Sequence, residues 1–141
     1  MSTTTDVYRE KVLRKLAGGN QYRKVRGVIF QIAGKRFHVK VKTGTQNKYP
    51  FNINDTVLSA DYQVVICGTD ECYYVLPINL MRQMHADPLA MPDYRNEDKG
   101  YTIYDVHPQQ NKIVFGTGGK SVDVAKYRNL TLNQDLTPFP L

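Results

Sequence analysis

The sequence predicts an α/β protein with a central mixed β-sheet, and two strand patterns carry this prediction. Between Gly27 and Thr43, an apolar run, a glycine-containing turn and a strictly alternating run follow one another, as in a β-hairpin. From Tyr62 to Cys67 the chain is almost continuously apolar, which is typical of a strand covered on both faces. Helical patterns lie before and after these strands, so we expect helices to flank the sheet.

Two helices are expected. The first begins with Thr5 or Asp6 as its N-cap and runs to about Ala17, with apolar residues at helical spacing and a Gly-Gly pair just beyond its end. The second runs from Ile78 to His85 and follows a strand that ends at a proline.

The hairpin pairs an apolar strand, 28–32, with a basic strand, 36–42, around a turn at 33–35. Side chains of a strand alternate between its two faces, so the second strand has one apolar face. Its opposite face carries a row of basic side chains: Arg36, His38, Lys40 and Lys42. Such a row is the solvated face of a sheet or the contact surface for an anion.

The whole chain is expected to divide into an α/β core at 1–88, a loop or linker at 89–100, and an appended β-hairpin with a tail at 101–141, packed on the core. A short edge segment is expected at 48–53. The appended strands are expected at 101–106 and 112–115, and the tail from Leu132 should be extended. Residues 122–130 fit either a strand or a short helix.

The charge is concentrated at one end of the chain. The first 50 residues hold 12 Lys or Arg against 2 acids, whereas residues 51–141 hold 7 against 11. A basic pole is typical of a surface that binds a polyanion, and nucleic acid is the expected partner, with DNA ahead of RNA. The predicted contact residues are Arg23, Lys24, Arg26, Arg36, His38, Lys40, Lys42 and Lys48, with the rings of Tyr22 and Tyr49 for stacking or sugar contact.

Other functions have weaker signals. The chain has no apolar run of about 18 residues and no signal-peptide pattern, so we expect a soluble, intracellular protein of the cytoplasm with no membrane partner. The histidines and cysteines lack metal-ligand spacing, and no cofactor is expected. Residues 115–121 end like a phosphate-binding loop, but Val114 stands where that motif needs glycine, so a glycine-rich turn is favoured.

Two motifs within this order of elements resemble the PD-(D/E)XK nuclease superfamily, and in particular its small endonuclease-like members. They are VKVKTG, Val39–Gly44, and ADYQVVICGTDECYYVLP, Ala60–Pro77. The resemblance covers roughly residues 6–85 and implies a PD-(D/E)XK-like core. It also implies self-association, because nuclease-like cores often work as dimers or larger assemblies.

The resemblance implies that Lys42 matches the catalytic lysine and that Glu10 matches the helical glutamate of some members. Such nucleases hold Mg²⁺ with an acid on the first hairpin strand and another acidic or amide residue two positions before the lysine. Here that position is Lys40, and residues 27–32 contain no carboxylate. A lysine at about 4 Å from a divalent cation would cost roughly 8 kcal/mol at an effective dielectric constant of 20.

We therefore expect a nucleic-acid-binding protein on a nuclease-like fold that lacks the usual metal-binding acids. Two alternatives stay open. One is an active Mg²⁺-dependent DNA endonuclease with a rearranged set of acids, in which Lys42 and Glu10 are catalytic. The other is a protein-interaction module or inhibitor built on the same scaffold.

Overall fold

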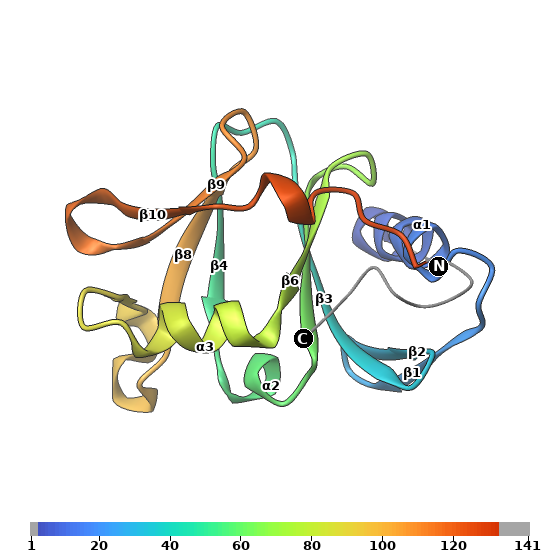
Figure 1. The fold of residues 1–141 in the computed structure, drawn as a ribbon, viewed down its shortest axis with the longest axis horizontal. Coiled ribbons are helices and arrows are strands. Elements are labelled where there is room, and N and C mark those ends of the chain that lie inside the picture. Colours follow the sequence, from blue (N-terminus) through green and yellow to red (C-terminus); the bar gives the residue numbers. More distant parts are fainter. Residues whose placement is uncertain (1–2, 133–141) are drawn as a thin grey trace.

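Two open β-sheets and three α-helices make up the part of the chain that the computed structural model describes, residues 3–132 apart from the side chain of Glu97 (Figure 1). Sheet A has the strand order β1-β2-β3-β5-β6: β1 Tyr22–Arg26, β2 Ile29–Ile32, β3 Lys35–Thr43, β5 Tyr62–Gly68 and β6 Tyr73–Pro77. Sheet B has the order β10-β9-β8-β4, with β7 beside β8: β4 Tyr49–Ile53, β7 Met91–Pro92, β8 Thr102–His107, β9 Lys112–Gly116 and β10 Lys120–Asp123. The helices are α1 Thr4–Ala17, α2 Asp55–Leu58 and α3 Ile78–Ala86, with short 3-10 turns η1 Tyr94–Lys99, η2 Thr117–Gly119 and η3 Ala125–Tyr127.

Helix α1 covers one face of sheet A. Its N-cap is Thr3, slightly earlier than predicted, because the Thr3 hydroxyl accepts from the Asp6 amide while the Asp6 carboxylate accepts from the Thr3 amide. The buried side chains of Val12 and Leu16 pack in one cluster with Val39 of β3. The basic strand therefore turns its apolar side toward α1, as its alternation predicted.

The predicted hairpin is formed by β2 and β3. Ala33 and Gly34 make a two-residue turn in which both residues have positive φ, 52° and 81°, the conformation that matches the twist of paired strands. Lys35, expected in the turn, instead begins β3. Strand β3 is parallel to β5, and β5 is antiparallel to β6, so sheet A is mixed as expected.

Sheet B is the main departure from the predicted architecture. Strand β4, the expected edge segment, pairs with β8, so residues on both sides of the predicted linker build one sheet. A large apolar cluster fills the space between the two sheets and α3, and the rings of Phe51 and Tyr104 stack within it at 6.0 Å. The fold is thus layered as α1, sheet A, then sheet B with α3 (Figure 1).

Three further segments refine the sequence-based expectations. The predicted loop or linker at 89–100 contains strand β7 and turn η1. The ambiguous stretch at 122–130 holds the end of β10 and turn η3. The predicted extended tail lies outside the described residues beyond Leu132. No helix among the described residues is long and apolar enough to cross a membrane.

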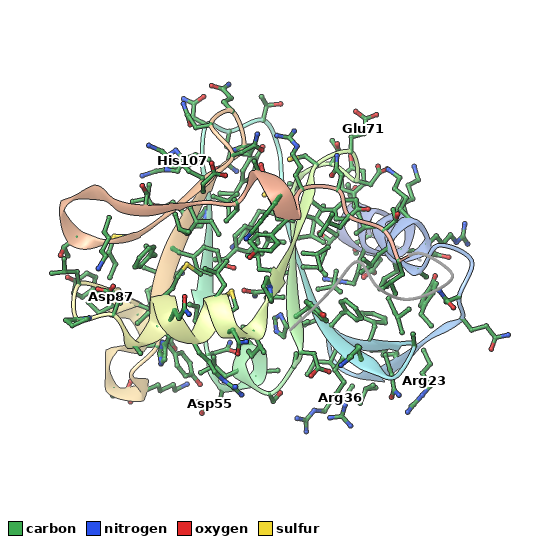
Figure 2. All side chains as sticks on the ribbon, in the orientation of Figure 1. Arg23, Arg36, Asp55, Glu71, Asp87 and His107 are labelled. Atoms are coloured by element: carbon green, nitrogen blue, oxygen red, sulfur yellow. The ribbon has the colours of Figure 1, made fainter. Side chains whose placement is uncertain are left out.

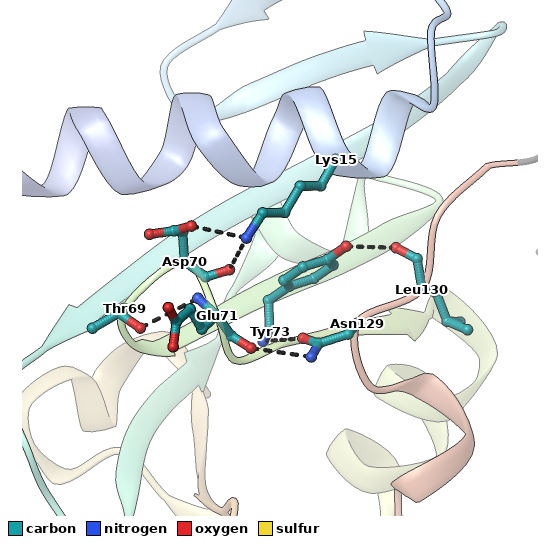
Figure 3. Close-up of polar contacts among 7 residues, drawn as sticks. All are labelled: Lys15, Thr69, Asp70, Glu71, Tyr73, Asn129 and Leu130. Atoms are coloured by element: carbon teal, nitrogen blue, oxygen red, sulfur yellow. Dashed lines mark hydrogen bonds and ion pairs between the residues drawn. The ribbon is translucent and has the colours of Figure 1, made fainter.

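The last described segment ties β6 to α1. The side chain of Asn129 accepts from the Tyr73 amide at 2.9 Å and donates to the Glu71 carbonyl at 3.0 Å, and the Tyr73 hydroxyl donates to the Leu130 carbonyl (Figure 3). The Leu132 amide then donates to the Leu16 carbonyl near the end of α1. These bonds bring the segment after β10 against the turn where α1 ends.

Close approach at this turn requires a glycine. Gly18 ends α1 with φ at 56°, and a Cβ there would lie 2.1 Å from the Leu132 carbonyl oxygen. Gly19 also has positive φ, at 92°, but a Cβ there would meet nothing within 4 Å. Alanine at either position carries the left-handed backbone penalty of about 1 kcal/mol.

We expect Gly18→Ala to lower the free energy of unfolding by roughly 1–2 kcal/mol more than Gly19→Ala, because only the first substitution forces backbone atoms apart. Urea unfolding followed by circular dichroism measures both variants. Equal losses would show that the segment at Leu132 moves aside without cost.

Candidate functional site

Basic side chains of β1 and β3 share one face of sheet A. Residues directly opposite in antiparallel strands lie on the same face, and the register pairs Arg23 with Gln31 and Gln31 with Arg36. Alternation along β3 then adds Lys40 and Lys42 to that face. We call this surface the basic face, formed by Arg23, Arg26, Arg36, Lys40 and Lys42, all of them exposed.

A β-bulge places Arg26 on the basic face. Arg23 and Arg26 are three residues apart, so regular alternation would separate them. The register shifts between Lys24 and Arg26, so that Arg26 lies opposite Ile29, on the same side as Gln31. The extra residue of a bulge reverses the alternation of the following side chains. In Figure 2, Arg23 and Arg36 both project outward from the lower side of the molecule.

Sheet B covers this face of sheet A only in part. On β5, the side chains of Val65 and Cys67 lie in the buried cluster between the sheets. Their neighbours on β3 are Lys40 and Lys42, which are exposed. The cover therefore ends beside Lys40 and Lys42 on β3. Beyond that edge the basic side chains are exposed, whereas Ile29 and His38, which share this face, are buried.

A hollow of about 100 Å³ lies at this edge. Lys40 and Lys42 of β3 line one side, Asn52 of β4 lines another, and Arg95 of η1 completes the polar lining. Three positive charges thus border a small concave site, with the apolar side chains of Pro50, Phe51 and Ile103 as the remaining lining. Sequence reasoning missed Asn52 and Arg95, since neither stands in a basic run.

The two lysines of the hollow have no acidic partner among the side chains that the structure describes. Arg95 lies 3.6 Å from Asp93, measured from Nε to Oδ1, but its side chain is 79% exposed. Arg95 therefore has room to turn toward a bound anion, while Lys40 and Lys42 are paired with none of the described acids.

Asp93 holds η1 beside β4. Its carboxylate is 2% exposed and accepts from the side-chain amides of Asn52 and Asn96 and from the Arg95 backbone amide. Burial by itself would raise the pKa of Asp93, but these hydrogen bonds lower it below the usual value, so the group is ionised at neutral pH. The bonds fix the backbone that carries Arg95.

His38 does not belong to the exposed cation row that the sequence predicted. It faces the expected side of β3 but is only 2% exposed, beneath the junction of the two sheets. Burial lowers the pKa of His38 to about 4, and the charges of Lys40 and Arg9 act in the same direction. Tyr104 donates to Gln63 Oε1, and Gln63 Nε2 lies 3.4 Å from His38 Nδ1, so a neutral imidazole accepts at Nδ1.

The two tyrosines predicted to stack are placed differently from that expectation. Tyr49 is 4% exposed in the core between the sheets, and its hydroxyl donates to the Gly44 carbonyl at 2.6 Å, so its ring is not presented for stacking. Tyr22 lies opposite Ile32 and packs half-buried in the cluster beneath α1. Neither ring faces the basic face.

Three predicted charged residues also lie away from the hollow. Lys24 pairs with Phe30, which places it on the α1 side of sheet A, because the bulge follows it. Lys48 is exposed near Asp105, at 3.8 Å. Glu10 sits on α1, across the sheet from Lys42, and pairs with Arg14 at 2.6 Å. The structure therefore does not bring Glu10 and Lys42 together.

The other residues and motifs considered in the sequence analysis form local turns and contacts. No group of three or more His, Cys, Asp or Glu side chains among the described residues could hold a metal ion. Asp61, at the start of β5, accepts from the Arg36 amide at 2.8 Å. Residues 116–120 form a turn between antiparallel strands, and Lys120 pairs with Asp87. Comparison with protein-family models, curated proteins and solved structures found no match.

The buried imidazole predicts a pH dependence of stability. Unfolded His38 takes up a proton near pH 6.5, whereas the folded protein resists protonation until about pH 4. The stabilisation is complete above pH 6.5 and is lost as the pH falls toward 4, by roughly 2–3 kcal/mol.

Urea unfolding of wild type and His38→Asn at about pH 7.5 and pH 4.5 tests this expectation. Asparagine keeps an acceptor for Gln63 but does not titrate, so the variant should lose less stability on acidification than wild type. Identical losses would show that His38 is protonated within the folded protein.

Proposed function

We propose that this protein binds nucleic acid, DNA in the first place, through the basic face. The observation that carries the proposal is the open basic face, whose two lysines line a hollow without a described acidic partner. Unpaired lysine and arginine side chains favour phosphate oxygens as ligands. A small anion such as sulfate would contact only part of the basic face, whereas a nucleic-acid backbone can contact its whole length.

The dimensions of the basic face suit a polyphosphate. Arg36 and Lys42 lie six residues apart on β3, which is about 20 Å at the rise of a strand. Strand β1 adds Arg23 and Arg26 about 10 Å away, two strand spacings across the sheet. A stretch of about 20 Å corresponds to roughly six nucleotide steps of a DNA strand.

The arrangement of the core supports a PD-(D/E)XK-like origin for this surface. The VKVKTG strand, the DYQVVIC strand and the YYVLP strand are neighbours in sheet A as β3, β5 and β6. Helix α1 packs on the face opposite Lys42. The chain departs from a simple α/β crossover between β3 and β5, because it passes through β4 of sheet B and the short helix α2.

The proposed role is binding without cleavage. In the nuclease pattern an acid stands two residues before the lysine, whereas here Lys40 lines the same hollow as Lys42. An ammonium group at this place attracts phosphate and repels a divalent cation. The surface can therefore orient a sugar-phosphate backbone.

We expect Lys40→Glu/Lys42→Glu to weaken DNA binding strongly, because the substitution places two negative charges in the hollow. The control is Lys24→Glu/Lys35→Glu, which changes the net charge equally but on the α1 side of sheet A. Fluorescence anisotropy with a labelled oligonucleotide at several salt concentrations measures both. The companion Lys40→Ala/Lys42→Ala should reduce the slope of log affinity against log salt by about 1.5.

Equal weakening by the two Glu pairs would mean that net charge, and not the basic face, determines binding. Failure of the wild-type protein to bind DNA or RNA at low salt would overturn the proposal and favour a protein partner for the basic face.

We also expect supercoiled plasmid to remain intact when incubated with the protein and Mg²⁺ or Mn²⁺, because Lys40 opposes metal binding beside Lys42. Agarose gel electrophoresis is the measurement. Metal-dependent nicking that disappears in Lys42→Ala would instead establish an endonuclease with a rearranged set of acids.

A further inference from the structure

A second, larger hollow adjoins the cation-lined one. It has a volume of about 560 Å³ and lies against β4, β7, β8 and η1. Its apolar lining comes from Pro50, Met91, Pro92 and Ile103, with Tyr94 at its border. Pro50, Ile103 and Arg95 line both hollows, so the two lie side by side. Arg95 stands where the cationic part meets the apolar part.

Among the large hydrophobic side chains that the structure describes, that of Tyr94 is the most exposed to solvent, at 75%. An exposed ring beside an apolar hollow contributes little to folding, since most of its surface stays in water. Its backbone is nevertheless held, because the adjacent Asp93 accepts from Asn52, Asn96 and the Arg95 amide. The ring is thus carried by an ordered turn at the border of the hollow.

The combined site matches one nucleotide. Lys40, Lys42 and Arg95 supply three positive charges, and the one acid in the lining, Asp93, is engaged by its hydrogen bonds. A flat apolar ring system fits beside a tyrosine and a guanidinium, which both stack on bases of any sequence. A phosphate joined to a nucleobase is the ligand that places an anion and such a ring system next to each other.

We propose that the two hollows together bind one unpaired nucleotide of single-stranded DNA, with its phosphate between Lys40, Lys42 and Arg95 and its base against Tyr94. This inference rests on the proposed nucleic-acid binding and adds the form of the ligand. A base within a duplex is stacked and paired, so it enters such a hollow only after extrusion, which costs free energy. The protein therefore prefers single-stranded DNA to the paired duplex of the same sequence.

The test compares wild type, Tyr94→Ala and Tyr94→Phe on a labelled single-stranded oligonucleotide and on its duplex, by fluorescence anisotropy. We expect Tyr94→Ala to lose about tenfold in affinity for the single strand and to keep its duplex affinity within about twofold. Tyr94→Phe, which retains the ring, should bind as wild type does. A 2-aminopurine base in the strand should change its fluorescence on binding to wild type and not on binding to Tyr94→Ala.

Tyr94→Ala that keeps the single-strand preference and the 2-aminopurine signal would overturn this inference. In that case, loss of binding in Lys40→Glu/Lys42→Glu would still support the basic face as the DNA contact. Absence of binding by the wild-type protein to either form would remove both proposals. Because Tyr94 is exposed, its substitution should leave the thermal unfolding midpoint nearly unchanged, and circular dichroism verifies that each variant is folded.

Discussion

The cost of burying an unpaired ammonium group limits how far sheet B can cover sheet A. On β5 the covered positions are Val65 and Cys67, whereas their neighbours on β3 are Lys40 and Lys42. Burying a lysine ammonium group without a partner costs several kcal/mol, which exceeds the stabilisation gained by burying the methylene groups of the same side chain. The contact between the sheets therefore ends at β3. The open basic face and the hollow at its edge both follow from this limit.

One strand face thus has two environments. His38 lies two residues before Lys40 and shares its face, but it is buried and neutral because a histidine can lose its charge near neutral pH. Lysine deprotonates only at much higher pH in water, so it must stay at the surface. Alternation assigns the face of each side chain, and the chemistry of each side chain then decides how closely sheet B can approach.

Local patterns predicted much of this structure, and long-range pairing accounts for what they missed. Helix α1, the β2–β3 hairpin and the α/β class followed from periodicity and turn residues. The pairing of β4 with β8 joins residues about 50 positions apart, and the alternation within each strand does not indicate which strand it will pair with. The bulge that moves Arg26 onto the basic face depends on register, so the basic run at 23–26 could not reveal which of its members share a face. The sequence could not indicate Arg95 as a site residue either, because only the long-range pairing of the fold brings it close to Lys42.

The charges of the hollow would couple the binding of an anion to folding. Lys40 and Lys42 are about 7 Å apart along the strand, a separation at which two positive charges repel by roughly 0.6 kcal/mol in water and about 2 kcal/mol at a dielectric constant of 20. Arg95 adds a third positive charge, and the described acids offset it only through Asp93. Lys40 and Lys42 stay close in the unfolded chain because one residue separates them, whereas only the folded chain holds Arg95 beside them. An anion that binds between all three charges needs the folded state and therefore stabilises the fold. Packing between the sheets creates the hollow, and a bound phosphate would in turn reinforce that packing.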